Sequence, residues 1–234
     1  MDPRDRILVA LDTHDQAELL RLAKTLGPHV GGFKIGLEAL LGIGLKECLN
    51  TVVPYGRQRR CVFVDAKLHD IGDTMAGASK AIVQYPGVMS YNVHASAGPT
   101  GMRKAAAVKG DAKLLAVTVL TSLDDEECER IYGADTEDTV ERLAELTRGC
   151  GVDGIICAPT DVERMKEAYP DMLLVTPGVR SKGVAKNDQK RVMTPGEAFR
   201  RGSTHIVSGR QLTAADSPVA AAKLLAEEIA EAFR

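Results

Sequence analysis

The feature that most constrains the fold is a regular alternation of short β-rich runs with longer amphipathic stretches. Eight runs have strand character, at residues 7–12, 32–36, 61–67, 88–94, 113–120, 154–158, 173–177 and 205–208. Helical patterns follow them, at residues 15–26, 38–49, 74–84, 99–108, 136–150, 161–168, 194–201 and 218–233. Eight strands, each followed by one helix, within 234 residues predict an α/β fold, a single-domain (β/α)8 TIM barrel that spans residues 1–234.

Two observations favour this barrel over an open sheet. Several strands are almost continuously apolar, as in the Leu-Leu-Ala-Val run at 114–117, which is typical of a parallel sheet covered on both faces. An open, doubly wound sheet usually carries a glycine-rich phosphate loop after its first strand. Here the polar run Asp-Thr-His-Asp at 12–15 follows that strand instead. Because no linker or repeat divides the chain, we expect one barrel.

Composition excludes several classes of partner. Lysine and arginine total 30 and the acidic residues 32, for a formal charge of −2, so we expect neither a nucleic-acid surface nor a membrane-binding one. Aromatic residues make up 4% and tryptophan is absent, which disfavours a base-stacking surface. A small molecule is the expected partner.

Cysteine usage and the first residues indicate a reduced, soluble, cytoplasmic protein. The five cysteines are odd in number and show no Cys-x-x-Cys spacing, so we expect no disulfide framework and no structural zinc. The first apolar run is too short for a signal peptide or a membrane span. No histidine or carboxylate cluster has the spacing of a metal site.

Charged residues at the carboxyl ends of three successive strands indicate a functional site. Asp12 ends the first strand, Lys34 lies in the second, and Asp65 and Lys67 end the third. Because side chains alternate along a strand, Asp65 and Lys67 share a face with Phe63, and the opposite, apolar face would pack on the helices. Inward-pointing charges are costly unless they are paired, so we expect a charge network in the barrel mouth. Each charge alone would be read as a solvated strand end or a structural ion pair.

A phosphate site is expected at the ends of the last two strands. Barrels commonly bind phosphate through the loops after strands seven and eight. Gly209 and Arg210 follow the eighth strand, and Arg180 follows the seventh. Two long polar connections, at 121–135 and 180–192, lie on the same predicted face, and the second is interpreted as a lid over a bound ligand or as an ordinary surface loop.

At this point the sequence resembles the orotidine 5′-phosphate decarboxylase family over essentially its whole length. The segments that carry the resemblance are Ala10-Leu11-Asp12, Phe33-Lys34-Ile35-Gly36, Asp65-Ala66-Lys67-Leu68-His69-Asp70-Ile71, Val117-Thr118-Val119-Leu120-Thr121-Ser122, Thr176-Pro177-Gly178-Val179-Arg180, Asn187-Asp188-Gln189 and Gly209-Arg210. The Asp-x-Lys-x-x-Asp motif alone is shared by a wider group of phosphate-binding barrels. Together with the Pro-Gly-x-Arg and Asp-Gln segments it is specific.

The resemblance implies a role for each matched residue. It implies a catalytic Lys-Asp-Lys-Asp array of Lys34, Asp65, Lys67 and Asp70, with Lys67 as the proton donor to C6 of the pyrimidine. The substrate-binding residues that it implies are Asp12 and Lys34 for the ribose, Thr121 for the pyrimidine, and Arg180, Gln189, Gly209 and Arg210 for the 5′-phosphate.

The resemblance also implies a homodimer with shared active sites. In the family the last aspartate of the array reaches the site from the other subunit, so Asp70 and Thr74 would complete the partner's pocket. The implied reaction is decarboxylation of orotidine 5′-monophosphate to UMP, the last step of de novo pyrimidine biosynthesis, with no metal and no cofactor. One departure is Gly72, which stands where many members have proline; it loosens the turn without excluding the function.

Two other functions stay open on the sequence. The first is a Mg²⁺-dependent sugar-phosphate decarboxylase or aldolase of the same barrel group, of the 3-keto-gulonate 6-phosphate decarboxylase type. Those enzymes generally carry an acid where Lys34 stands, because a divalent cation prefers oxygen ligands, so Lys34 counts against this alternative. The second is a catalytically silent barrel that binds nucleotides or partners, which a fold alone never excludes.

Overall fold

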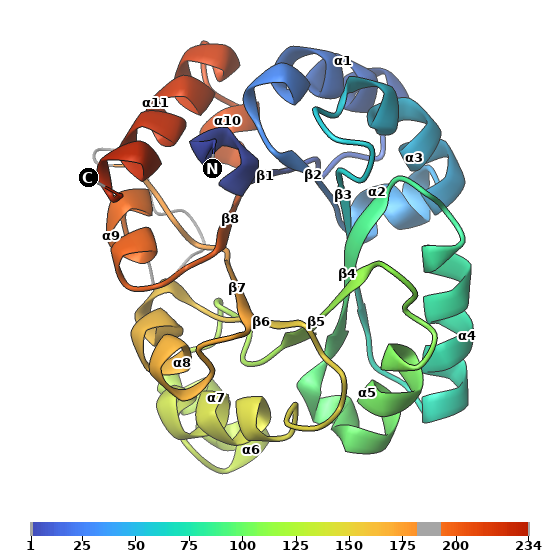
Figure 1. Cartoon of the computed structure of the whole chain (residues 1–234), viewed down its shortest axis with the longest axis vertical. Coiled ribbons are helices and arrows are strands. Elements are labelled where there is room, and N and C mark those ends of the chain that lie inside the picture. The colour runs from blue at the N-terminus through green and yellow to red at the C-terminus, as the bar shows by residue number, and fades with distance from the viewer. Residues whose placement is uncertain (1, 182–192, 234) are drawn as a thin grey trace.

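The computed structural model describes residues 2–181 and 193–233. Within them eight parallel strands form a closed barrel in which each strand pairs with the next and β8 pairs with β1 (Figure 1). The strands are β1 (Ile7–Ala10), β2 (Gly32–Ile35), β3 (Val62–Leu68), β4 (Val88–His94), β5 (Lys113–Val117), β6 (Gly154–Ile156), β7 (Leu173–Thr176) and β8 (His205–Ser208). The predicted (β/α)8 barrel is confirmed.

The helices form an outer ring around the barrel (Figure 1). They are α1 (Gln16–Leu26), α2 (Leu37–Gly42), α3 (Leu45–Val52), α4 (Gly72–Val83), α5 (Gly98–Ala106), α6 (Asp125–Tyr132), α7 (Thr136–Glu145), α8 (Val162–Ala168), α9 (Pro195–Arg200), α10 (Arg210–Thr213) and α11 (Pro218–Glu231). Among the helices of the described residues, none combines the length and apolar character needed to cross a bilayer.

The prediction of one helix after each strand was wrong after β2, β5 and β8. The stretch 38–49 forms two helices, α2 and α3, because Gly44 has a φ of +91°, which interrupts the helical backbone and favours glycine. The polar connection 121–135 contains α6. Asp124 begins this helix with a capping box, and Gly133 ends it in the left-handed conformation.

Several strands also end earlier than predicted. β5 stops at Val117 instead of residue 120, although Val119 is buried in the same core as the helices. A run of apolar residues in a sequence indicates that the residues are buried. Here the residues stay buried beyond the last residue that pairs with a neighbouring strand, so the apolar run is longer than the strand. β3 instead extends to Leu68, one residue further than predicted, with a register irregularity against β4.

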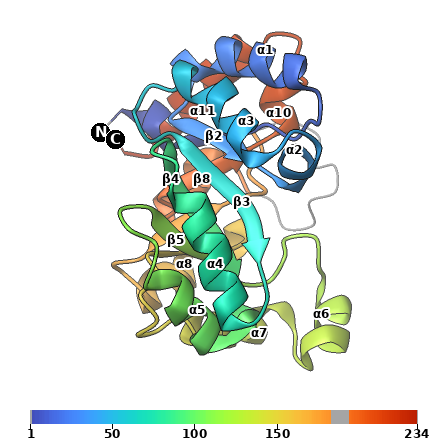
Figure 2. The same ribbon diagram turned by 90° about the vertical axis from the view of Figure 1, so that its right-hand side faces the viewer.

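The core has two layers that follow from the alternation of side chains along each strand. Leu8, Phe63, Leu115 and Val175 pack together as a small cluster inside the barrel. Val62 and Val64, the neighbours of Phe63, belong instead to the large cluster between strands and helices. This arrangement confirms the face assignment in β3 and directs its polar carboxyl end into the barrel mouth. In Figure 2, β3 runs toward the side of the molecule where α2 and α6 lie.

Candidate active site

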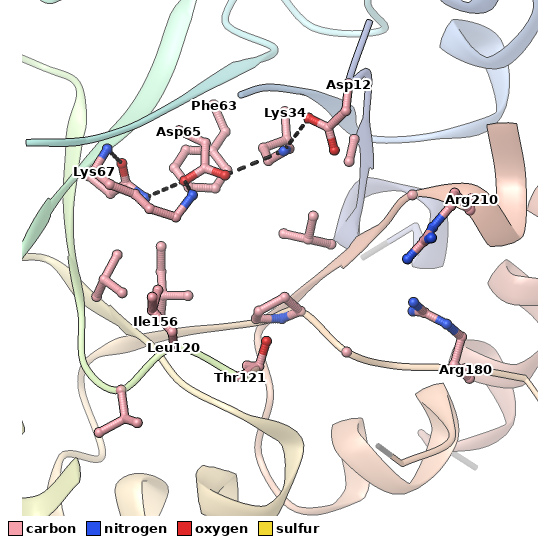
Figure 3. Close-up of a pocket in the computed structure, with 18 residues that line it drawn as sticks. Asp12, Lys34, Phe63, Asp65, Lys67, Leu120, Thr121, Ile156, Arg180 and Arg210 are labelled. Carbon is pink, nitrogen blue, oxygen red and sulfur yellow. Dashed lines mark hydrogen bonds and ion pairs between the residues drawn. The ribbon is translucent and has the colours of Figure 1, made fainter. Parts of the chain in front are cut away.

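A pocket opens at the carboxyl ends of the strands, and its lining comes from each of the eight strands or the turn directly after it. Phe63 and Ile156 form part of the floor, and charged side chains stand above them (Figure 3). Parallel barrels gather the ends of distant strands at one face, which is why residues far apart in sequence meet here.

Four charged side chains form a continuous array along one side of this pocket (Figure 3). Lys34 Nζ lies 2.6 Å from Asp12 Oδ1 and 3.4 Å from Asp65 Oδ2. Lys67 Nζ lies 2.7 Å from Asp65 Oδ1. Lys34 and Asp65 are both 8% exposed, so the centre of the array is buried and its two ends are open to a ligand. The predicted charge network is confirmed.

Asp65 lies at the centre of the array, and opposing effects act on the pKa of its carboxyl group. Burial by itself would raise the pKa of its carboxyl group, but the charges of Lys34 and Lys67 and the hydrogen bonds from Lys67 and Asn92 hold the pKa below the usual range. Asp65 is therefore an anion at neutral pH, held between two ammonium groups. An anion and a cation are thus fixed next to each other along one side of the pocket.

Two residues that the sequence reasoning missed support the array. Asn92 in β4 is fully buried, and its Nδ2 donates to Asp65 Oδ1 at 2.7 Å. A Cβ atom at Gly36 would lie 2.7 Å from Asp12 Oδ1 and 2.8 Å from Lys34 Nζ, so this position has room only for glycine while the ion pair is in place. The signals were an asparagine on the inward face of an apolar strand and a glycine two residues after a strand lysine.

Arginines occupy the other side of the pocket. Arg180 and Arg210 both line it, together with Gly178 and Gly209, and Figure 3 shows the two guanidinium groups directed toward each other. Arg180 Nη1 donates to the carbonyl oxygen of Val179 at 2.7 Å. Guanidinium groups are donors suited to a phosphate dianion. The structure thus brings together the two arginines that the sequence assigned to one site.

The remaining predicted site residues fall into three groups. Thr121 lines the pocket as expected. Gln189 lies outside the described residues, as does most of the segment 180–192 that was interpreted as a lid. Asp70 and Thr74 do not line the pocket of this chain: both side chains are exposed, and Asp70 Oδ1 accepts a hydrogen bond from the Ile71 backbone N–H at 2.6 Å.

Among the described residues, no histidine lines this pocket and no cluster of side chains there could hold a metal ion. His94 is not among the residues that line it; its ring lies 5.5 Å from that of His69, and burial together with the charges of His69 and Lys67 lowers its pKa to about 4. His94 is therefore neutral at physiological pH. Within residues 2–181 and 193–233, no group of three or more His, Cys, Asp or Glu side chains is placed to hold a metal ion.

Comparisons with known proteins agree on one family. The sequence model of the "Orotidine 5'-phosphate decarboxylase / HUMPS family" matches residues 5–225. An orotidine 5′-phosphate decarboxylase of Moorella thermoacetica is 43% identical over 98% of this chain and 94% of that protein. One from Syntrophomonas wolfei is 38% identical over 99% of this chain and 100% of that protein. The crystal structure of the Lactobacillus acidophilus enzyme aligns with a TM-score of 0.80 at 30% identity, covering 95% of this chain and 98% of that one.

Proposed function

The chain belongs to the orotidine 5′-phosphate decarboxylase / HUMPS family, and from this premise we propose that it is a carboxy-lyase that converts orotidine 5′-monophosphate to UMP and CO2 without a metal or a cofactor. This is the last step of pyrimidine nucleotide synthesis. The observation that carries the proposal is one pocket that holds the array Asp12–Lys34–Asp65–Lys67 on one side and Arg180 and Arg210 on the other.

The chemical difficulty of this reaction lies in the charge left at C6. Loss of CO2 leaves a vinyl carbanion with no adjacent electron sink, so the protein must stabilise the negative charge directly. An ammonium group placed at C6 favours that charge as it develops and can then deliver the proton. Lys67 supplies this group, because its Nζ projects into the pocket and is held by Asp65 at 2.7 Å.

Asp65 contributes in two ways. It orients the Lys67 ammonium, and its charge lies beside the carboxylate that leaves. Two anions about 4 Å apart repel by roughly 4 kcal/mol at an effective dielectric of 20. This repulsion accelerates the reaction only to the extent that it is relieved in the transition state. We therefore assign the larger part of the rate acceleration to Lys67, and we assign to Asp65 the role of positioning the Lys67 ammonium group.

The rest of the pocket binds parts of the substrate that do not react. Asp12 and Lys34 face the ribose hydroxyls, Thr121 faces the pyrimidine, and Arg180 and Arg210 with the backbone at Gly209 hold the 5′-phosphate, with Gln189 as a further phosphate ligand. Contacts to such remote groups supply binding energy that positions C6 against Lys67.

Lys34 argues against the Mg²⁺-dependent alternative. Its Nζ lies between the carboxylates of Asp12 and Asp65, the place where a divalent cation would need oxygen ligands. The ammonium groups of Lys34 and Lys67 already balance the charges of the two carboxylates, so a further cation there would meet like charge. The side chains of Asp12, Lys34 and Asp65 thus suit the ribose hydroxyls of a nucleotide better than a sugar phosphate whose reaction intermediate needs a bound metal ion.

The assembly that we propose is a homodimer in which each subunit completes the other's site. Asp70 and Thr74 are exposed after β3, and Ile71 beside them is 73% exposed. Leu37 and Leu41 of α2, after the neighbouring strand β2, are 50% and 85% exposed. Exposed apolar side chains beside exposed polar ones are typical of an interface between copies of a chain.

The direct test is the ultraviolet absorbance of orotidine 5′-monophosphate mixed with purified protein in EDTA. Conversion to UMP supports a metal-independent decarboxylase, and orotidine without its phosphate should turn over far more slowly. Activity only on a keto-sugar phosphate after addition of Mg²⁺ would contradict the proposal and favour the alternative. Inactivity on both substrates would favour a nucleotide-binding barrel.

The Gly36→Ala substitution should lower kcat/KM by about 100-fold, because the added methyl group would lie 2.7 Å from Asp12 Oδ1 and 2.8 Å from Lys34 Nζ and therefore forces the ion pair out of its position. The fold should survive, since the atoms that must move are the ends of two flexible side chains. Steady-state kinetics and thermal melting check this. Gly77→Ala on α4 is the control, because nothing lies within 4 Å of a Cβ atom there. An unchanged kcat/KM in Gly36→Ala would show that the pair is dispensable.

A further inference from the structure

The backbone at Lys67 departs from the regular strand. Val64 of β3 pairs with Tyr91 of β4, and the next paired residue, Leu68, is opposite Val93. Three residues of β3 therefore face the single residue Asn92, and such a bulge leaves groups outside the ladder unpaired. Lys67 has a φ of +48°, the one non-glycine residue in the described chain with a positive φ. A non-glycine residue keeps this conformation only where its surroundings hold it there.

Asn92 fills the gap that this bulge creates. Its side chain is fully buried on the inward face of β4 and lines the pocket. Its Oδ1 accepts from the backbone N–H of Lys67 at 2.7 Å, and its Nδ2 donates to Asp65 Oδ1 at 2.7 Å. The orientation of the amide is unambiguous, because a backbone N–H only donates and an ionised carboxylate only accepts.

One carboxylate oxygen connects Asn92 to the reacting group. Asp65 Oδ1 accepts from both Asn92 Nδ2 and Lys67 Nζ. The amide therefore holds the lysine at two points: directly at its backbone, and through Asp65 at the end of its side chain. Lys34 lies 3.4 Å from the other carboxylate oxygen, a longer contact than the two hydrogen bonds on Oδ1, so Asn92 and Lys67 make the shortest contacts to Asp65.

We propose that Asn92 is a positioning residue for the decarboxylation, which locks the Lys67 backbone in its bulged conformation and fixes the Asp65 carboxylate, so that the ammonium group stays aimed at C6. This inference rests on the proposed function. Asn92 touches neither the proton that is transferred nor the bond that breaks. It acts through Asp65 and Lys67.

Two substitutions at Asn92, to leucine and to aspartate, separate this role from simple packing. Asn92→Leu removes both hydrogen bonds, and we expect kcat to fall by about 100-fold while KM and the affinity for UMP change by less than about threefold, since the ribose and phosphate contacts lie elsewhere. Ser90→Ala is the control. Ser90 is buried two residues earlier on β4 and pairs with Phe63 in the layer below, and its removal should leave kcat unchanged.

The Asn92→Asp variant adds a signature in the pH profile. The new aspartate keeps an acceptor for the Lys67 backbone N–H but places a second carboxylate next to that of Asp65. The two carboxylates then share one proton and titrate as a pair with one raised pKa. The other charged groups that face Asp65 are Lys34 and Lys67, and the pKa of the buried His94 is lowered to about 4, so this histidine is neutral over the range tested. Below the raised pKa the shared proton restores the missing hydrogen bond. Activity relative to the native enzyme should therefore be highest at low pH and fall as the pH rises.

The outcomes distinguish this inference from the function on which it rests. A native enzyme that fails to decarboxylate orotidine 5′-monophosphate would overturn both. An active native enzyme together with an unchanged kcat in Asn92→Leu would overturn the positioning role alone. So would an Asn92→Asp variant whose activity falls by the same factor at every pH, because that pattern indicates packing. If Asn92→Leu does not fold, the pH profile of Asn92→Asp decides.

Discussion

Replacing Lys67 with alanine should lower kcat for orotidine 5′-monophosphate by about 10⁴-fold or more while UMP still binds. A positioned proton donor contributes roughly 10²–10⁴-fold, and a charge aimed at the developing carbanion adds about 10²–10³-fold. Lys67 would supply both, because its Nζ is the cationic end of the array that projects into the pocket. Binding should persist because the proposed phosphate and ribose ligands are untouched.

Single-turnover absorbance and titration with UMP check this result. Lys104→Ala is the matched control, since Lys104 is an exposed lysine paired with Asp73 at 2.6 Å on the helices outside the barrel. That variant should keep native turnover. Measurable turnover in Lys67→Ala beyond a few per cent of the native rate would exclude Lys67 as the proton donor, and loss of UMP binding would place it among the binding residues instead.

The Asp70→Ala substitution should reduce turnover by about 100-fold or more although Asp70 does not line the pocket of its own chain. If Asp70 completes the partner's array, its removal leaves a cationic group there without its anion, and breaking such a pair is strongly destabilising. Asp73→Ala is the control: this carboxylate lies three residues further on, at 85% side-chain exposure, and should be dispensable. An Asp70→Ala variant with native kcat would contradict shared sites.

Mixing two inactive variants tests the sharing directly. A hybrid dimer of Asp70→Ala and Lys67→Ala subunits contains one intact site, formed by Lys67 of the first chain and Asp70 of the second. Random reassociation of equal amounts makes half of the dimers hybrid, so about a quarter of the native activity should return. Two different affinity tags verify that hybrids form. No recovery after verified exchange would place Asp70 outside the partner's site.

Local chemistry explains why part of the site could be predicted. Lys67 and Asp65 alternate with Val64 and Ala66, and a period of two on a strand fixes which side chains point into a barrel before any coordinates are known. The same logic missed Asn92, because its importance depends on which strand lies beside β3 and on a bulge that no local pattern signals. Gly36 was missed because its small size matters only once Asp12 and Lys34 meet above it.

The sequence by itself determined the barrel, the inward face of β3 and the presence of two arginines after the last strands, since these follow from periodicity and from position along the chain. Tertiary structure alone decided which side chains meet and at what distances: the ion pairs around Lys34, the bulge of β3 opposite Asn92, and the hydrogen bonds of Asn92. The physical reason is that each of these joins residues far apart in sequence, and their register is set by packing of the whole barrel rather than by any segment within it.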